Sequence, residues 1–163
     1  MAMSDSHNTI VLQAAPGGVF KEGNLDVTAG LKPGHGVEFK AATEPTGGRH
    51  AIRAYSGTNG HRKLIMILLE NEIIGRTVDD TVPDNEQCRM YCPVPGDELL
   101  VLVSATGTGT GDSVAIGDKL MLANGGTFIA TTGSPEAEPF EVLETLSDVV
   151  AAGTLCHVVF TGN

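Results

Sequence analysis

Glycine and proline recur so often along this sequence that no long helix fits between them. The 163-residue chain holds 21 glycines and 8 prolines, and they separate apolar segments that are only a few residues long. This pattern is typical of short strands joined by turns, because glycine permits positive φ and proline cannot continue a helix. About nine to eleven such segments predict a compact all-β fold, a barrel or a sandwich. Aromatic residues make up only 4% of the chain, so we expect a core of aliphatic side chains.

The apolar pattern of individual segments predicts how they are buried. Residues 64–69 and 98–104 are almost continuously apolar, which predicts strands buried on both faces. Residues 37–41 alternate apolar and charged side chains, which predicts a half-exposed strand. Residues 71–86 form an acidic connector that we expect on the surface, and residues 147–152 favour one helical turn.

A short turn motif recurs before predicted strands. Residues 96–99 and 117–120 share the order Gly-Asp-charged-Leu, directly before an apolar segment. Glycine permits the dihedral angles of the turn, and aspartate accepts a backbone N–H at the start of the strand. We therefore interpret these aspartates as structural. Asn124-Gly125-Gly126 predicts a hairpin turn between strands at 119–123 and 127–131.

The first twenty residues differ from the rest. Residues 1–20 have no clear period beyond the apolar stretch Ile10, Val11 and Leu12, so we expect an extended N-terminal arm and a single β-rich domain over residues 21–163. The apolar stretch is suited to adding a strand to the edge of a neighbouring sheet. The arm has no positively charged region followed by an apolar one, so we expect no secretory signal and synthesis in the cytoplasm.

The cysteines and histidines provide few options for chemistry. Cys88 and Cys92 lie about 13 Å apart on an extended strand, beyond disulfide reach, so we expect reduced thiols. With Cys156 and His157 they provide four possible zinc ligands, but a Cys-x3-Cys pair and an adjacent pair are an awkward set on strands. We therefore expect no metal.

Other candidate motifs are incomplete. His50 and His61 have no accompanying nucleophile motif, and the Thr-Gly repeat at 106–111 lacks the lysine of a phosphate-binding loop. The sequence thus predicts a protein that is not an enzyme and that takes no cofactor.

Charge is unevenly distributed. Up to Lys63, seven basic and five acidic side chains give a net charge of +2, whereas three basic and fifteen acidic side chains follow it, a net charge of −12. Such asymmetry can orient one subunit against its neighbour or steer a partner of opposite charge. Arg49, Arg53, Arg62 and Lys63 form a candidate basic patch. The few basic residues argue against direct binding of nucleic acid, and no apolar run is long enough to cross a membrane.

Three stretches resemble the capsid decoration, or cement, proteins of tailed bacteriophages. They begin at Tyr91-Cys-Pro-Val-Pro-Gly-Asp, Gly109-Thr-Gly-Asp-Ser-Val and Pro139-Phe-Glu-Val-Leu-Glu, and the similarity of pattern and length extends from Leu25 to the C-terminus. The resemblance implies a β-barrel or β-tulip domain that forms homotrimers. It also implies binding of the major capsid protein on the outer surface of the virion, between capsomers, where the protein braces the head against the pressure of packaged DNA.

Two other classes of function stay open. One is a ligand- or carbohydrate-binding β-barrel on a virion or cell surface, although sugar-binding platforms usually need exposed aromatic rings and the chain has no Trp. The other is a small trimeric β enzyme with a titratable group at a subunit junction.

Overall fold

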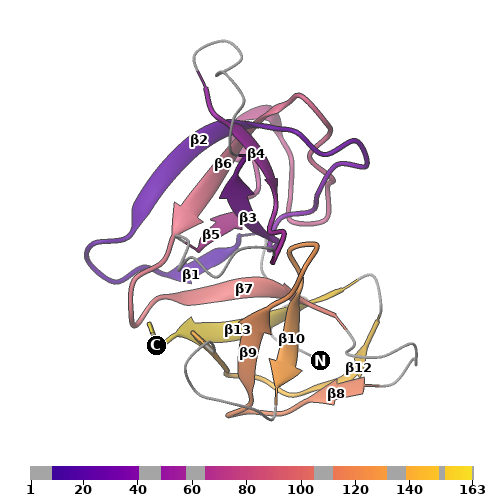
Figure 1. The fold of residues 1–163 in the computed structure, drawn as a ribbon. Helices are drawn as coiled ribbons and strands as arrows, with labels where there is room; N and C mark the ends of the chain where they lie inside the picture. The colour runs from indigo at the N-terminus through magenta and orange to yellow at the C-terminus, as the bar shows by residue number, and fades with distance from the viewer. Residues whose placement is uncertain are drawn as a thin grey trace.

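The protein folds into two small β-barrels that pack on each other (Figure 1). The computed structural model describes residues 9–40, 49–57, 65–104, 112–131, 139–150 and 153–162. The strands in these ranges are β1 (Val11–Gln13), β2 (Val19–Leu25), β3 (Gly36–Phe39), β4 (Ala51–Ala54), β5 (Met66–Leu68), β6 (Gln87–Cys92), β7 (Glu98–Val103), β8 (Asp112–Val114), β9 (Lys119–Leu122), β10 (Phe128–Thr131), β11 (Phe140–Val142), β12 (Leu146–Val149) and β13 (Thr154–Phe160). A short 3-10 helix, η2 (Glu72–Ile74), lies between β5 and β6. The all-β class predicted from glycine and proline is confirmed.

The first barrel closes in the order β2-β4-β3-β5-β6. Its core holds Met66 and Leu68 of β5 together with Cys88 and Met90 of β6. Ile67, between Met66 and Leu68, and Tyr91, directly after Met90, point the other way, into the core of the second barrel. This arrangement explains why the sequence around β5 is continuously apolar: the strand lies between two cores, and its predicted burial on both faces is confirmed.

The second barrel is formed by β7, β10, β9, β11 and β13 in that order, and β13 pairs back with β7. Its core includes the T-shaped pair Phe128 and Phe140, whose ring centroids lie 5.0 Å apart. The pairing of β9 with β10 confirms the predicted hairpin. Strand β1 pairs with the start of β7, and β8 and β12 form a separate two-stranded sheet.

Main-chain hydrogen bonds join the two barrels. The Gly36 N–H donates to the Gly126 carbonyl at 2.7 Å, and the Leu102 N–H donates to the Gly34 carbonyl at 3.0 Å. A Cβ atom on Gly126 would lie 2.5 Å from the Gly36 carbonyl oxygen. The barrels therefore approach each other at a distance that only glycine permits at this position.

Two expectations about individual segments need correction, and one strand was not expected. Residues 147–152 do not begin a helical turn, because β12 extends to Val149 and Leu146 pairs with Val114 of β8. The alternation at 37–41 does not place the charged side chain outside: Glu38 is 2% exposed, whereas Phe39 is 37% exposed. Strand β2 was not predicted, although it is one of the longest in the described ranges. None of the helical structure in those ranges has the length and apolar character needed to cross a membrane.

Candidate functional site

The predicted strand of the N-terminal arm pairs within its own chain. Ile10 is fully buried, and its carbonyl accepts a hydrogen bond from the Leu100 N–H at 2.8 Å. Val11 and Leu12 are partly buried against the same core, and Val11 pairs with Leu99 of β7. Figure 1 shows β1 between the two barrels. From residue 9 onward the arm is thus part of the fold, and residues 1–8 lie outside the described residues.

Two carboxylates hold this part of the arm in place. Glu70 accepts hydrogen bonds from the Thr9 hydroxyl at 2.7 Å and from the Ile10 N–H at 3.1 Å. Asp97, which is fully buried, accepts hydrogen bonds from the Ala15 N–H and, at 2.7 Å, from the Val94 N–H. The acidic side chain in the turn motif is therefore structural, as predicted.

The predicted basic patch is only partly available to a partner. Arg53 lies 2.7 Å from the buried Glu38 carboxylate, and its Nη2 donates to the Ser56 hydroxyl at 3.2 Å, so its charge is used inside the molecule. Arg49 is more exposed and lies 3.7 Å from Glu22. Arg62 and Lys63 lie outside the described residues. Their place in a partner interface remains a prediction.

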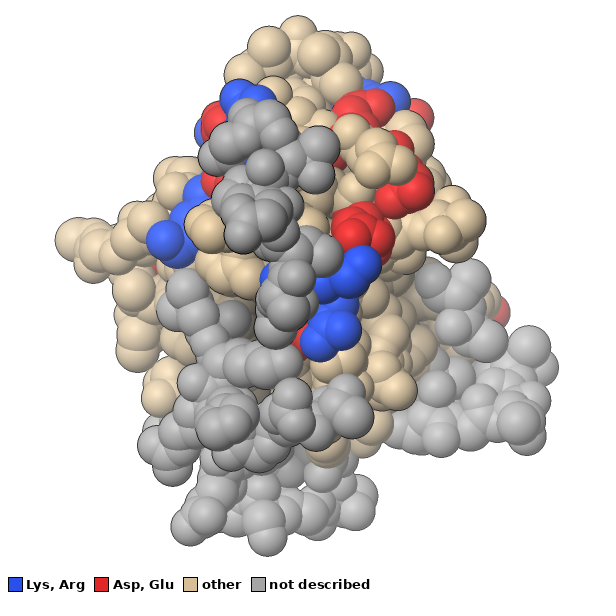
Figure 2. Space-filling view, turned by 45° about the horizontal axis from the view of Figure 1, so that its top comes forward, with Lys and Arg blue, Asp and Glu red and all other residues tan. Residues whose placement is uncertain are grey.

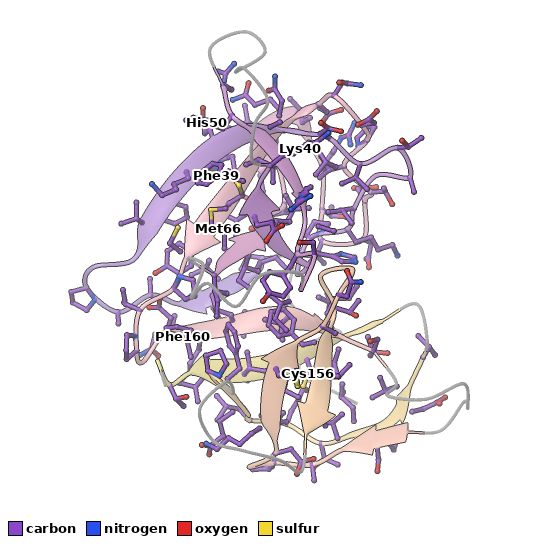
Figure 3. The ribbon with its side chains drawn as sticks, viewed as in Figure 1. Phe39, Lys40, His50, Met66, Cys156 and Phe160 are labelled. Atoms are coloured by element: carbon purple, nitrogen blue, oxygen red, sulfur yellow. The ribbon has the colours of Figure 1, made fainter. Side chains whose placement is uncertain are left out.

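The cysteines are divided between the two barrels. Cys88 and Cys92 lie in the core of the first barrel, and Cys156 lies in the core of the second. Figure 3 shows Cys156 in the second barrel, well apart from the labelled side chains of the first. All three are free thiols, and burial raises the pKa of Cys88 and of Cys156 to about 12. In the described ranges, no three His, Cys, Asp or Glu side chains are grouped so as to hold a metal ion.

The histidine next to Cys156 points away from that thiol, as neighbouring residues on a strand do. His157 Nε2 lies 2.9 Å from a Glu98 carboxylate oxygen, and its backbone N–H donates to Glu144 at 2.8 Å. Of the two other histidines singled out in the sequence, His50 packs its ring against Phe39 at a centroid distance of 5.3 Å, and His61 lies outside the described residues. Figure 3 shows His50 and Phe39 in the first barrel. These contacts give His50 and His157 packing and hydrogen-bonding roles.

A surface that the sequence did not predict lies on β2. Val19 and Phe20 are 48% and 53% exposed, and the Arg89 guanidinium lies over the Phe20 ring, 5.6 Å from its centroid. We define the β2 surface as Val19, Phe20, Lys21 and Arg89. By the register with β6, Val19 and Lys21 point to one face of the strand, whereas Phe20 and Arg89 point to the other, where Glu22 stands opposite Arg89. Among the described residues, neither Lys21 nor Arg89 forms an ion pair.

The β2 surface also presents an open strand edge. Strand β2 pairs with β6 from Val19 to Asn24, but on its other edge it pairs with β4 only at Asn24 and Leu25. The first half of β2 thus has no strand neighbour on that edge within the described part of the chain. The signal that would have predicted this strand is the Pro16-Gly17 turn before it, which resembles the Pro95-Gly96 turn before β7.

A second exposed apolar surface lies on the acidic connector. Ile73 and Ile74 are 82% and 56% exposed, and Glu72, Asp79 and Asp80 are exposed beside them in the sequence. We define these five residues as the connector surface. In Figure 1 β2 lies on the left of the first barrel, and the connector between β5 and β6 runs along its right. In Figure 2 the largest group of acidic side chains lies on the right, and basic side chains lie on the left and in the centre.

Comparison with known proteins adds evidence on the fold. No family model and no curated protein matches the sequence. Among solved structures, the chain is similar to the crystal structure of the head fiber gp8.5 N base in bacteriophage phi29, with a TM-score of 0.52 and 13% sequence identity. The match covers 88% of this chain and 94% of the chain in that structure. This chain therefore shares the fold of a base module from a phage head fiber.

Proposed function

We propose that this protein is a structural component of a tailed-phage virion. It binds the major capsid protein on the outer surface of the head, between capsomers, as a homotrimer, and it stabilises the head against the pressure of packaged DNA. The observation that carries the proposal is the fold shared with a phage head-fiber base over 88% of the chain. The independent resemblance of three sequence stretches to capsid decoration proteins supports the same role.

The contrast between buried carboxylates and exposed apolar side chains agrees with a binding role. The buried carboxylates Glu38 and Asp97 are used to hold strands and turns together. The exposed apolar side chains Phe20, Ile73 and Ile74 instead offer area to partners. Because a shell presents many equivalent sites and an oligomer engages several at once, each copy needs only a weak contact for the whole to bind tightly.

The cations proposed to face the capsid are Arg49, Arg62 and Lys63. Arg53 is not suitable for a binding test, because its removal would also disrupt the ion pair with the buried Glu38 carboxylate. Deleting residues 1–20 is equally unsuitable, because it removes the buried Ile10 and the strand β1.

The test uses assembled phage heads that lack this protein. Purified protein is added at increasing concentration, binding is measured by co-sedimentation, and the particles are imaged by cryo-electron microscopy. We expect saturable binding, new density between capsomers, and retention of DNA at higher temperature than in bare heads. Arg49→Glu combined with Arg62→Glu should weaken binding and its dependence on salt, whereas Lys32→Glu, which reverses an exposed cation outside the patch, should not. Heads that bind no protein would contradict the proposal.

A further inference from the structure

The β2 surface and the connector surface are complementary in chemistry. Both offer exposed apolar side chains, Val19 and Phe20 on one and Ile73 and Ile74 on the other. The charges beside them that form no ion pair within the described ranges have opposite sign: Lys21 and Arg89 are basic, whereas Glu72, Asp79 and Asp80 are acidic. Glu22 and Arg76 carry the other sign in these segments, but they are paired with Arg49 and Glu86. Four exposed apolar side chains in two groups, each bordered by unpaired charges of one sign, are what an interface with a charged rim requires.

The two surfaces cannot meet within one molecule. They lie on opposite sides of the first barrel, as Figure 1 shows. We propose that the occupant of the β2 surface is a second copy of this chain, whose connector surface docks on it. The contact is heterologous, because different patches meet, so repetition of the same contact closes a ring or propagates a fibre. This inference deepens the proposed function by naming the surfaces through which copies associate.

The charges favour contact between the β2 surface of one copy and the connector surface of another. The chain carries a net charge of −10, so two copies repel each other unless positive charge faces negative charge locally. Lys21 and Arg89 have no anionic partner in the described part of the chain and are available for this purpose. A connector docked along the edge of β2 places its carboxylates beside these cations, while its two isoleucines contact Val19 on one face of the strand and Phe20 on the other. A β2–β2 contact would instead bring like charges together.

The first experiment measures self-association of the free protein by sedimentation equilibrium and by light scattering. We expect a concentration-dependent oligomer, and we expect Ile73→Ser to weaken association about tenfold or more by removing an apolar side chain from the interface. Phe20→Ser should do the same, but it also removes a ring that packs 4.9 Å from Tyr91, so Ile73→Ser, at an 82% exposed position, is the cleaner variant. Ile116→Ser is the matched control, because Ile116 is 67% exposed outside both surfaces, and it should leave association unchanged.

The second experiment reverses the charges. The pair Lys21→Glu and Arg89→Glu should weaken association, and so should the pair Glu72→Lys and Asp79→Lys. All four changes in one chain restore opposite charges across the contact and should restore association. Circular dichroism spectra and thermal unfolding of each variant establish that the fold is retained.

Three results would overturn the inference. The first is a monomer at every concentration, and the second is an oligomer that Ile73→Ser leaves unchanged. The third is a chain in which each pair of charge reversals weakens association but all four changes together do not restore it. Binding to heads is scored separately by co-sedimentation. An Ile73→Ser variant that binds heads as single copies would leave the proposed head-binding function intact, whereas a chain that associates but binds no heads would contradict that function alone.

Discussion

Glu38 shows how one residue can be buried against the pattern of its own strand. Its carboxylate is 2% exposed, and it accepts hydrogen bonds from Arg53 Nε and from the Ser56 hydroxyl, both at 2.8 Å. A carboxylate removed from water is tolerated only where such partners replace the lost hydration. The alternation of residues 37–41 predicted an exposed Glu38 because the two compensating groups belong to β4 and to the segment after it.

Removing the cation should be costly for this reason. We expect Arg53→Ala to lower the free energy of unfolding by about 3 kcal/mol, because it removes a cation that contacts a buried carboxylate at 2.7 Å. Arg49→Ala is the matched control. Its guanidinium lies 3.7 Å from Glu22, and both side chains are about half exposed, so the loss should stay below about 1 kcal/mol. Urea unfolding gives the free energy of unfolding of both variants. An equal decrease in the two would show that the Arg53–Glu38 pair stabilises the fold no more than the exposed Arg49–Glu22 pair does.

Turns with a positive φ angle determine where six of the thirteen described strands begin. A residue with positive φ stands two positions before the first residue of six strands: Gly17 before β2, Gly34 before β3, Asn85 before β6, Gly96 before β7, Gly117 before β9 and Gly126 before β10. This regularity explains why glycine-based interpretation located β7, β9 and β10 well. The Pro16-Gly17 turn has the same form, and the sequence prediction did not include β2 because this turn was interpreted as part of the arm.

Aspartate completes this turn in two places, with different consequences. Asp97 and Asp118 each accept the backbone N–H three residues earlier, at 2.7 and 2.8 Å, but only Asp97 is fully buried and also binds Ala15. Asp118→Ala should therefore lower the free energy of unfolding by about 1 kcal/mol, whereas Asp97→Ala should lower it by about 3 kcal/mol. Asp97→Ala should also speed amide hydrogen exchange at Val11–Gln13, because the arm loses a contact that holds it. Unchanged exchange there would show that β1 is held by its pairing with β7 alone.

Strand β12 shows where local sequence fails. Residues 147–152 favour a helical turn by composition, but Leu146 and Val149 are buried and β12 pairs with β8. Pairing with a distant segment outweighs a weak local preference. The surfaces on β2 and the connector were missed for a related reason: exposure of Phe20 and Ile73 depends on what packs around them, which no short window of sequence contains.

At the scale of the whole molecule, two barrels behave as one body because strands are shared between their cores. Ile67 and Tyr91 belong to strands of the first barrel and lie in the core of the second, and main-chain hydrogen bonds at Gly34 and Gly36 cross the junction. The sequence could not predict this division, because the same turns and the same aliphatic composition occur in both halves. This rigidity would serve the proposed role of bracing a shell, since force applied to one barrel is carried by the other.

The junction can be tested with two neighbouring glycines. Gly125 and Gly126 have positive φ angles of 96° and 87°, so alanine at either position costs about 1–2 kcal/mol for its backbone conformation. A Cβ atom at Gly125 meets nothing within 4 Å, whereas one at Gly126 would lie 2.5 Å from the Gly36 carbonyl oxygen of the other barrel. We therefore expect Gly126→Ala to lower the free energy of unfolding by at least about 1 kcal/mol more than Gly125→Ala, because the clash forces the barrels apart. Urea unfolding gives the difference, and hydrogen exchange at Gly36 shows whether its bond to residue 126 is the one that weakens. If the two variants lower the free energy of unfolding equally and hydrogen exchange at Gly36 is unchanged, the contact between Gly126 and Gly36 does not hold the barrels together and does not transmit force.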